Sequence, residues 1–236
     1  RADIAGEGLL NGDRLKLKGE PASITNVGSV PNVCEFYAMS ANYVIDNVIY
    51  GTLTVAPRPI TVVTAGASKV YDGEALSKTD GWQTYLYGDG TQKGLLGEDT
   101  LTLDTSATIP SITNFGTLTN EVKYTVPSNY AVAEYVNGTL EILKRRIIVS
   151  TETDKKVYDG AALSNSGYKT VWEKDETKSG LLNGDELTLF KPAEIREVGG
   201  PTLNNCEYYE PNDNYEIASY RYGTLTIKPR PIMVIT

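Results

Sequence analysis

The sequence predicts an all-β protein that consists of tandem copies of one small β-sandwich module, and three observations support this. First, phrases recur in order: GLLNGD at 8–13 returns as GLLGED at 94–99 and as GLLNGD at 180–185, in steps of 86 residues (94 − 8 and 180 − 94). Second, short alternating segments are separated by turn residues about every 8–15 residues. Third, no long segment free of Gly and Pro has apolar residues at helical spacing. A unit of this size fits a small independent domain better than a solenoid repeat of about 20–50 residues.

The middle copy shows the expected strands in order. Residues 57–64 alternate and are β-branched, so they form a first strand that a proline opens. KVYDG at 69–73 is expected to be a short edge segment that ends in an Asp-Gly turn. Residues 82–87 alternate again and lead into a polar hairpin. The remaining strands are expected at 100–103, 122–126, 130–135 and 139–143, which gives about seven strands per copy.

These strands favour a sandwich of immunoglobulin-like type, with a β-grasp-like sheet as the alternative. The β-grasp alternative needs a helix, and the only room for one lies near 75–80 or 107–114. Neither segment has a helical pattern of apolar residues.

Proline-rich and basic phrases mark the expected boundaries between the copies. With these phrases as joints, the chain divides into a partial repeat 1 that lacks its first strands (1–57), the complete repeat 2 (58–144), the complete repeat 3 (145–229) and a strand that continues beyond it (230–236). An alternative phase places the joints before each KVYDG, near 64 and 150. In both phases repeat 1 lacks KVYDG, and the exposed strand edge that results invites strand exchange or head-to-tail contact with another chain.

Composition excludes several classes of protein. The net charge of −8 argues against binding to nucleic acid. No apolar run approaches the roughly 20 residues that a membrane-spanning helix needs, so we expect no membrane insertion of this segment. Histidine is absent, which removes the commonest general base and the commonest metal ligand. No nucleophile motif is present either, so we expect no catalytic residue, no metal and no cofactor.

The two cysteines occupy equivalent places in different repeats. Cys34 lies eight residues before Asn42, and Cys206 lies eight before Asn214, while repeat 2 has Val122 at the corresponding position. A position that accepts Cys, Val and Cys indicates a small buried apolar site, and no intramolecular disulfide is expected.

The ordered phrases resemble a known family. KVYDG-x-A-L, GLL-x-G-D, Asn-Tyr with a following GTLTI strand, and PRPITV together are similar to the MBG/YDG-type repeats of large bacterial surface proteins. The resemblance implies stalk or adhesive modules of an exported, adhesin-like protein, anchored to the cell wall, with no catalytic residues. It therefore favours a non-enzymatic stalk or spacer at the extracellular bacterial cell surface, and a glycan- or mucin-binding module is the alternative. Partners would then be a host glycan or an extracellular protein.

A covalent cross-link is one candidate for special chemistry. Surface β-domains can join a buried lysine to an asparagine by an isopeptide bond, with a carboxyl group that moves the proton, because burial makes the amine nucleophilic. Each complete repeat contains such a set: Lys69, Asp72 and Asn129 in repeat 2, and Lys156, Asp159 and Asn214 in repeat 3. The structural interpretation is that the lysine is a solvated edge charge and that the asparagine sets a turn before tyrosine.

Aromatic and acidic side chains give two further candidates. Tyr85 and Tyr87 share one face of their strand and would be the outward members of a glycan-binding platform, against ordinary cross-strand pairing. Glu210, Asp213 and Glu216 could surround calcium, but no EF-hand spacing is present and a solvated acidic loop is the simpler interpretation.

Overall fold

The computed structural model describes residues 8–10 and 12–236, and this part of the chain contains strands and no helix. The prediction of an all-β, sandwich-like fold is confirmed, whereas immunoglobulin-like topology stays a prediction. Residues 1–7 of repeat 1, and Asn11 within its GLLNGD phrase, lie outside the described residues. Among the described residues no helix is long and apolar enough to cross a membrane.

The chain forms two compact units, whose limits do not follow the repeats. Unit 1 comprises Arg1–Val62, Gln83–Leu103 and Tyr124–Val136, and unit 2 comprises Val63–Trp82, Asp104–Lys123 and Asn137–Thr236. Repeat 2 contributes to both units, while repeat 3 lies wholly in unit 2.

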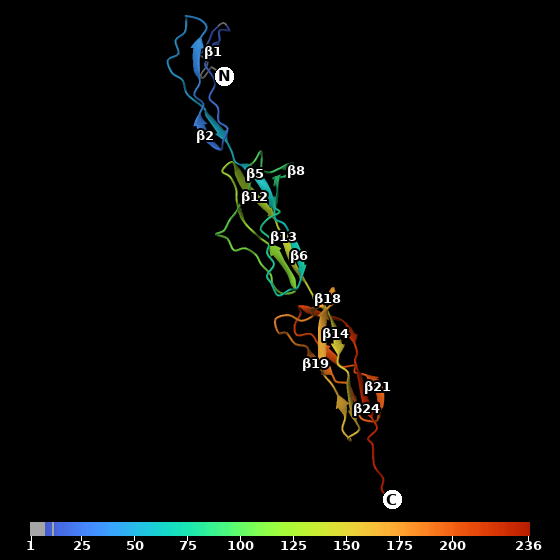
Figure 1. Cartoon of the computed structure of the whole chain (residues 1–236). Helices are drawn as coiled ribbons and strands as arrows, with labels where there is room; N and C mark the ends of the chain where they lie inside the picture. The colour runs from blue at the N-terminus through green and yellow to red at the C-terminus, as the bar shows by residue number, and fades with distance from the viewer. Residues whose placement is uncertain (1–7, 11) are drawn as a thin grey trace. The chain divides into compact units, whose positions relative to one another are not determined.

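Unit 1 contains short sheets from repeat 1 and from part of repeat 2 (Figure 1). In repeat 1, two antiparallel pairs form: β1 (Leu15–Lys18) with β3 (Glu35–Ala38), and β2 (Gly28–Pro31) with β4 (Thr52–Val55). In repeat 2, the sheet has the order β12 (Tyr130–Val136), β5 (Arg58–Val63), β7 (Gln83–Leu86) and β8 (Asp89–Lys93), and β9 (Thr102–Leu103) pairs with β11 (Tyr124–Thr125). Alternation and β-branching along β5 explain its central place, because Ile60 and Val62 are fully buried.

Unit 2 contains the rest of repeat 2 and all of repeat 3. The repeat 2 sheet has the order β10 (Gly116–Asn120), β13 (Gly138–Leu143) and β6 (Ala67–Val70). Repeat 3 has a four-stranded sheet of β18 (Asp175–Ser179), β17 (Tyr168–Trp172), β14 (Arg145–Thr151) and β23 (Tyr215–Arg221), and a three-stranded sheet of β15 (Asp154–Val157), β24 (Thr224–Lys228) and β21 (Gly199–Leu203). Two short pairs complete it: β16 (Leu163–Ser164) with β20 (Glu194–Ile195), and β19 (Thr188–Lys191) with β22 (Glu207–Tyr209).

The core of repeat 3 lies between these two sheets. β14 is central because it pairs antiparallel with β17 and parallel with β23, and its Ile147 and Val149 are fully buried. Leu225 and Ile227 of β24 belong to the same apolar cluster. Repeat 3 has eleven short strands, β14 to β24, where about seven were expected, because β16, β18, β20 and β21 form in segments that were not expected to be strands.

The segments that the β-grasp alternative would need as a helix are not helical. Residues 75–80 and 107–114 contain turns and extended backbone, and an isolated antiparallel bridge joins Leu76 to Ile112. The bridge is closed by two backbone hydrogen bonds, of 2.8 and 3.0 Å.

The small apolar site before each Asn-Tyr pair is present in the two complete repeats. Val122 and Cys206 are each 1% exposed, as expected, whereas Cys34 of repeat 1 is only half-buried. Both thiols are free. The Cys206 site is not purely apolar, because its sulfur accepts a hydrogen bond from the backbone N–H of Ala193 at 3.2 Å.

One buried asparagine holds each complete repeat together, and neither was predicted from the sequence. The Nδ2 of Asn204 donates to the carbonyl oxygens of Glu152 (2.8 Å) and Asn165 (2.9 Å), and Asn120 makes the matching pair of bonds in repeat 2. Both side chains are fully buried. Each therefore ties three separate segments of backbone together where water cannot compete.

Candidate functional site at the repeat junction

The lysine of KVYDG closes its own turn. Nζ of Lys69 donates to Oδ1 of Asp72 and to the carbonyl oxygen of Glu74, both at 2.7 Å. In repeat 3, Lys156 does the same with Asp159 at 2.7 Å and with the carbonyl oxygen of Ala161 at 2.8 Å. We call this arrangement the lysine turn.

The carboxylates of the lysine turn also accept backbone hydrogen bonds. Oδ1 of Asp72 accepts from the N–H of Glu74, and Oδ1 of Asp159 accepts from Ala161, each at 3.0 Å. Burial raises the pKa of Asp72, but the hydrogen bonds and charge of Lys69 outweigh it, and the net pKa is lowered. The hydrogen bond from Lys156 lowers the pKa of Asp159. Both carboxylates are therefore ionised at neutral pH.

The late asparagine of each complete repeat binds the preceding repeat. In unit 2, Oδ1 of Asn214 accepts a hydrogen bond from the N–H of Phe115 at 2.6 Å, and its Nδ2 donates to Oδ1 of Asn114 at 3.2 Å. Asn114 belongs to an SITN phrase at 111–114, and the same phrase occurs in repeat 1 at 23–26. The contact is therefore made to a repeated loop.

Unit 1 contains the same contact one repeat earlier. Oδ1 of Asn129 accepts from the N–H of Val27 at 2.9 Å, and its Nδ2 donates to Oδ1 of Asn26 at 3.1 Å. The geometry is therefore repeated along with the phrases. We call this pair of bonds the asparagine lock.

The KVYDG phrase of repeat 2 lies at the same junction. The rings of Tyr71 and Tyr215 meet edge to face, with centroids 5.5 Å apart at 81°, and both are buried. A Cβ on Gly73 would lie 2.6 Å from Nδ2 of Asn183, in the GLLNGD phrase of repeat 3. Gly73 also has a φ of +83°, a backbone conformation that favours glycine.

An arginine at the start of repeat 3 completes the junction. Arg145 is buried, and it donates from Nε to the carbonyl oxygen of Gly180 and from Nη2 to that of Ser179, both at 2.7 Å. Its guanidinium lies 4.5 Å from the ring centroid of Trp172. Burial lowers the pKa of Arg145, while Tyr215 and Asp72 act in the opposite direction. Arg58 makes the same two bonds in repeat 2, each at 3.0 Å.

The structure brings together two of the three side chains of each proposed cross-link. Lys69 contacts Asp72, and Lys156 contacts Asp159. Lys156 donates to Asp159, Ala161 and Ala162, while the amide of Asn214 bonds to Asn114 and Phe115. The asparagines thus have a different role in this structure, as contacts between repeats.

The two aromatic candidates differ in how exposed their side chains are. Tyr87 is exposed, whereas Tyr85 is half-buried and donates its hydroxyl hydrogen to Gln83 at 2.7 Å. Two adjacent outward rings, as a sugar platform would need, are therefore not present on this strand.

The acidic loop of repeat 3 forms internal bonds. Glu210 accepts from the N–H of Ile217, and Glu216 pairs with Arg146. No group of three or more Asp, Glu, Cys or His side chains suited to a metal ion occurs among the described residues.

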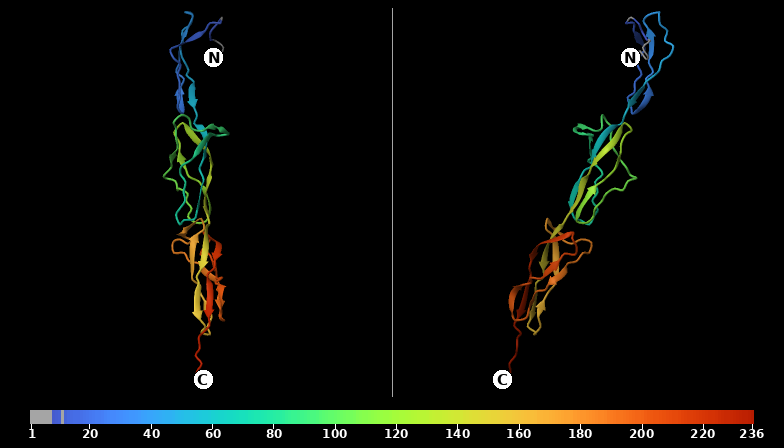
Figure 2. Two further views of the ribbon diagram at one scale, coloured as in Figure 1. Left: turned by 45° about the vertical axis from the view of Figure 1, so that its right-hand side comes forward. Right: turned by 180° about the vertical axis from the view of Figure 1, so that it is seen from behind.

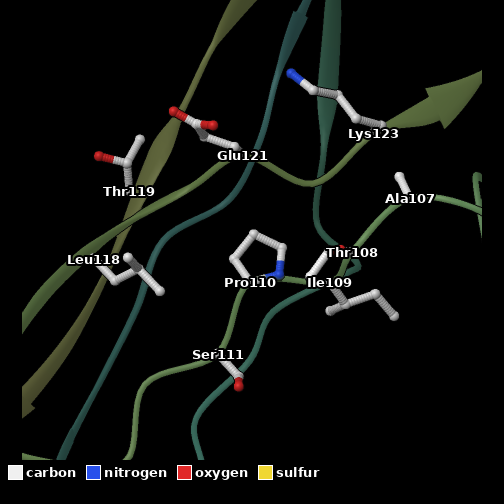
Figure 3. A pocket seen from close by; sticks show the side chains of 9 residues that line it. All are labelled: Ala107, Thr108, Ile109, Pro110, Ser111, Leu118, Thr119, Glu121 and Lys123. Atoms are coloured by element: carbon white, nitrogen blue, oxygen red, sulfur yellow. The ribbon is translucent and has the colours of Figure 1, made fainter.

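Unit 2 has a hollow of about 740 Å³, whose walls come from residues 107–111 and from residues 118–123. Figure 3 shows Ile109 and Pro110 on one wall and Leu118 and Thr119 on the other. Glu121 and Lys123 are its only charged lining residues. It contains no nucleophile–base pair and no metal-ligand set, so the repeat junction is the better candidate for the functional site.

No family model, curated protein or solved structure matches this sequence.

Asn214→Ala is expected to loosen the junction between repeats 2 and 3 and leave both folded. The change removes the acceptor for the N–H of Phe115 and the donor to Asn114, and a lost hydrogen bond of this kind costs about 1 kcal/mol. ¹⁵N relaxation should then give different rotational correlation times for β13 and β24, which we expect to be equal in the parent chain.

Asn205→Ala is the matched control for this experiment, because Asn205 is an exposed asparagine of the same repeat. It should leave the two correlation times equal. Equal values in Asn214→Ala as well would show that the asparagine lock does not couple the repeats.

Proposed function

We propose that this chain is a non-enzymatic tandem-repeat segment of an MBG/YDG-type bacterial surface protein, in which it acts as a spacer. The observation that carries the proposal is the asparagine lock, because it occurs at both junctions with the same donor and acceptor atoms. A chain of domains without specific contacts would behave as beads on flexible linkers. Side-chain contacts that recur at each junction instead restrict how successive repeats move.

The repeated phrases support this function rather than a ligand site. KVYDG, GLLNGD, SITN and Asn-Tyr all contribute atoms to the junction of unit 2. Phrases that recur along the chain thus supply the contacts between repeats 2 and 3. An array of this kind can be lengthened by adding repeats, because each new repeat brings both halves of a junction.

Localisation at the cell surface is tested by antibody labelling of intact bacteria that produce the protein. An antibody raised against residues 58–228 should label unbroken cells, and brief protease treatment of the cells should remove the signal. Labelling that requires lysis would overturn the surface assignment. If intact cells are labelled but β13 and β24 have unequal rotational correlation times in the unmodified chain, the surface assignment stands and only the spacer role is overturned.

A further inference from the structure

A pocket of about 470 Å³ lies at the junction of repeats 2 and 3, within unit 2. Its volume is within the range of about 300–1,000 Å³ that is usual for small-molecule sites. Residues 70–72 of repeat 2 form one wall, and the other comes from repeat 3, with Arg145, Trp172, Lys174, Lys178 and Leu182. Both views of Figure 2 show the hairpin of β17 and β18, drawn in orange, at the end of repeat 3 where the chain enters it. We call this hollow the junction pocket.

The junction pocket is locally basic, although the whole chain has a net charge of −8. Arg145, Lys174 and Lys178 line it, and the one carboxylate among its lining residues is that of Asp72. Asp72 is already paired within the lysine turn. Lys178 lies 3.4 Å from Asp175, with 63% of its side chain exposed, and the described part of the chain forms no ion pair with Arg145 or Lys174. An anion would therefore meet positive charge that the protein does not neutralise.

Trp172 gives the junction pocket an aromatic surface. The guanidinium of Arg145 lies 4.5 Å from its ring centroid, and Nζ of Lys178 lies 5.7 Å from it. The side chain is half-buried, so part of the indole remains accessible to a ligand. The two cations hold the ring in place and bring positive charge next to it.

Arg145 and Asp72 each keep one polar atom for a ligand. Arg145 is 5% exposed, and its Nε and Nη2 donate to backbone carbonyl oxygens, while Nη1 has no acceptor among the described residues. Oδ1 of Asp72 accepts from Lys69 and from a backbone N–H, while Oδ2 accepts no hydrogen bond from residues 8–10 or 12–236. A ligand with both an anionic group and a hydroxyl group satisfies the two, because a guanidinium donates to an anion and a carboxylate accepts from a hydroxyl.

The residues that β17, β18 and their turn supply to the pocket do not recur in repeat 2. The positions 86 residues before Trp172, Lys174 and Lys178 hold Leu86, Gly88 and Gln92. Repeat 2 nevertheless forms the corresponding hairpin of β7 and β8, and its arginine makes the same two hydrogen bonds. The indole and the two lysines are therefore not required for these shared contacts, which points to a role beyond joining repeats.

We propose that the junction pocket binds an acidic sugar, a monosaccharide unit that carries a carboxylate. The carboxylate lies against the cations of Arg145, Lys174 and Lys178. A C–H face of the sugar ring packs on Trp172, and a hydroxyl group donates to Oδ2 of Asp72. A long polyanion fits less well, because the net charge of −8 repels it outside the pocket. This binding site is additional to the spacer role and does not depend on it.

NMR titration of the whole chain with the methyl glycosides of glucuronic acid and of sialic acid tests the proposal. The chain has two tryptophans, so the indole N–H signal of Trp172 should shift and saturate while that of Trp82 stays in place as an internal reference. Methyl glucoside, which lacks the carboxylate, should bind about tenfold more weakly or less. Absence of a saturable Trp172 shift with either acidic sugar would overturn the proposal. An equal shift with acetate at the same concentration would also overturn it, because the sugar ring would then contribute nothing.

Lysine variants locate the site. Lys178→Gln, which copies Gln92 of repeat 2, combined with Lys174→Gln should weaken binding of the acidic sugar about tenfold or more. Both lysines are exposed, so the fold should not change. Lys169→Gln is the matched control, because Lys169 is an exposed lysine of β17 outside the pocket lining, and repeat 2 again has glutamine, Gln83, at that position. The control should bind as the parent chain does. An equal loss in the control would show that overall charge, and not the junction pocket, attracts the ligand.

Discussion

Arg145→Ala is expected to lower the free energy of unfolding of repeat 3 by about 3 kcal/mol. The guanidinium supplies hydrogen bonds to two carbonyl oxygens, those of Ser179 and Gly180, and packs on Trp172. Alanine leaves both oxygens without these donors and opens a space beneath the indole ring. Part of this loss is offset, because Arg145→Ala also removes the free-energy cost of taking a charged guanidinium out of water.

Guanidinium-induced unfolding followed by the fluorescence of Trp172 measures this change. The chain has two tryptophans, so Trp82 is replaced to leave Trp172 as the single probe. Trp82→Tyr introduces the residue that repeat 3 has at that position, Tyr168.

The control is Arg146→Ala at the next residue. Arg146 is half-exposed and pairs with Glu173 and Glu216 at the surface, where such pairs contribute little, so a change of less than about 1 kcal/mol is expected. Similar losses in the two variants would contradict the role assigned to the buried arginine.

The strand pattern could be predicted from the sequence because it depends on local alternation. The expected strands at 57–64, 130–135 and 139–143 correspond to β5, β12 and β13, within one or two residues at each end. The segments at 100–103 and 122–126 form only the two-residue strands β9 and β11. Both segments alternate polar and apolar residues, but the length over which they pair depends on which residues meet across the fold.

The junction could not be predicted in the same way. Asn214 and Tyr71 are 143 positions apart (214 − 71), and nothing local indicates that Tyr71 meets the tyrosine beside Asn214. Asparagine is also a common turn residue, so an asparagine before tyrosine fits a local turn as well as a contact with another repeat. One signal was available: the SITN phrase recurs at 23–26 and 111–114, and its asparagines, Asn26 and Asn114, are the residues that Asn129 and Asn214 contact.

Asn204→Ala is expected to destabilise repeat 3 by about 3 kcal/mol, because the carbonyl oxygens of Glu152 and Asn165 both lose the hydrogen bond that the fully buried Asn204 amide donates. These bonds hold the segment after β14 and the loop before β17 against the segment that precedes β22. Asn204→Asp separates hydrogen bonding from packing, since the carboxylate has the same shape but cannot donate when ionised. It should cost at least as much as alanine at neutral pH, because it also places a charge against two carbonyl dipoles.

Asn205→Ala, at the exposed neighbouring position, should change stability by less than about 0.5 kcal/mol in the same fluorescence assay. If Asn204→Asp were as stable as the parent chain, the amide donors would not be what holds these three segments together.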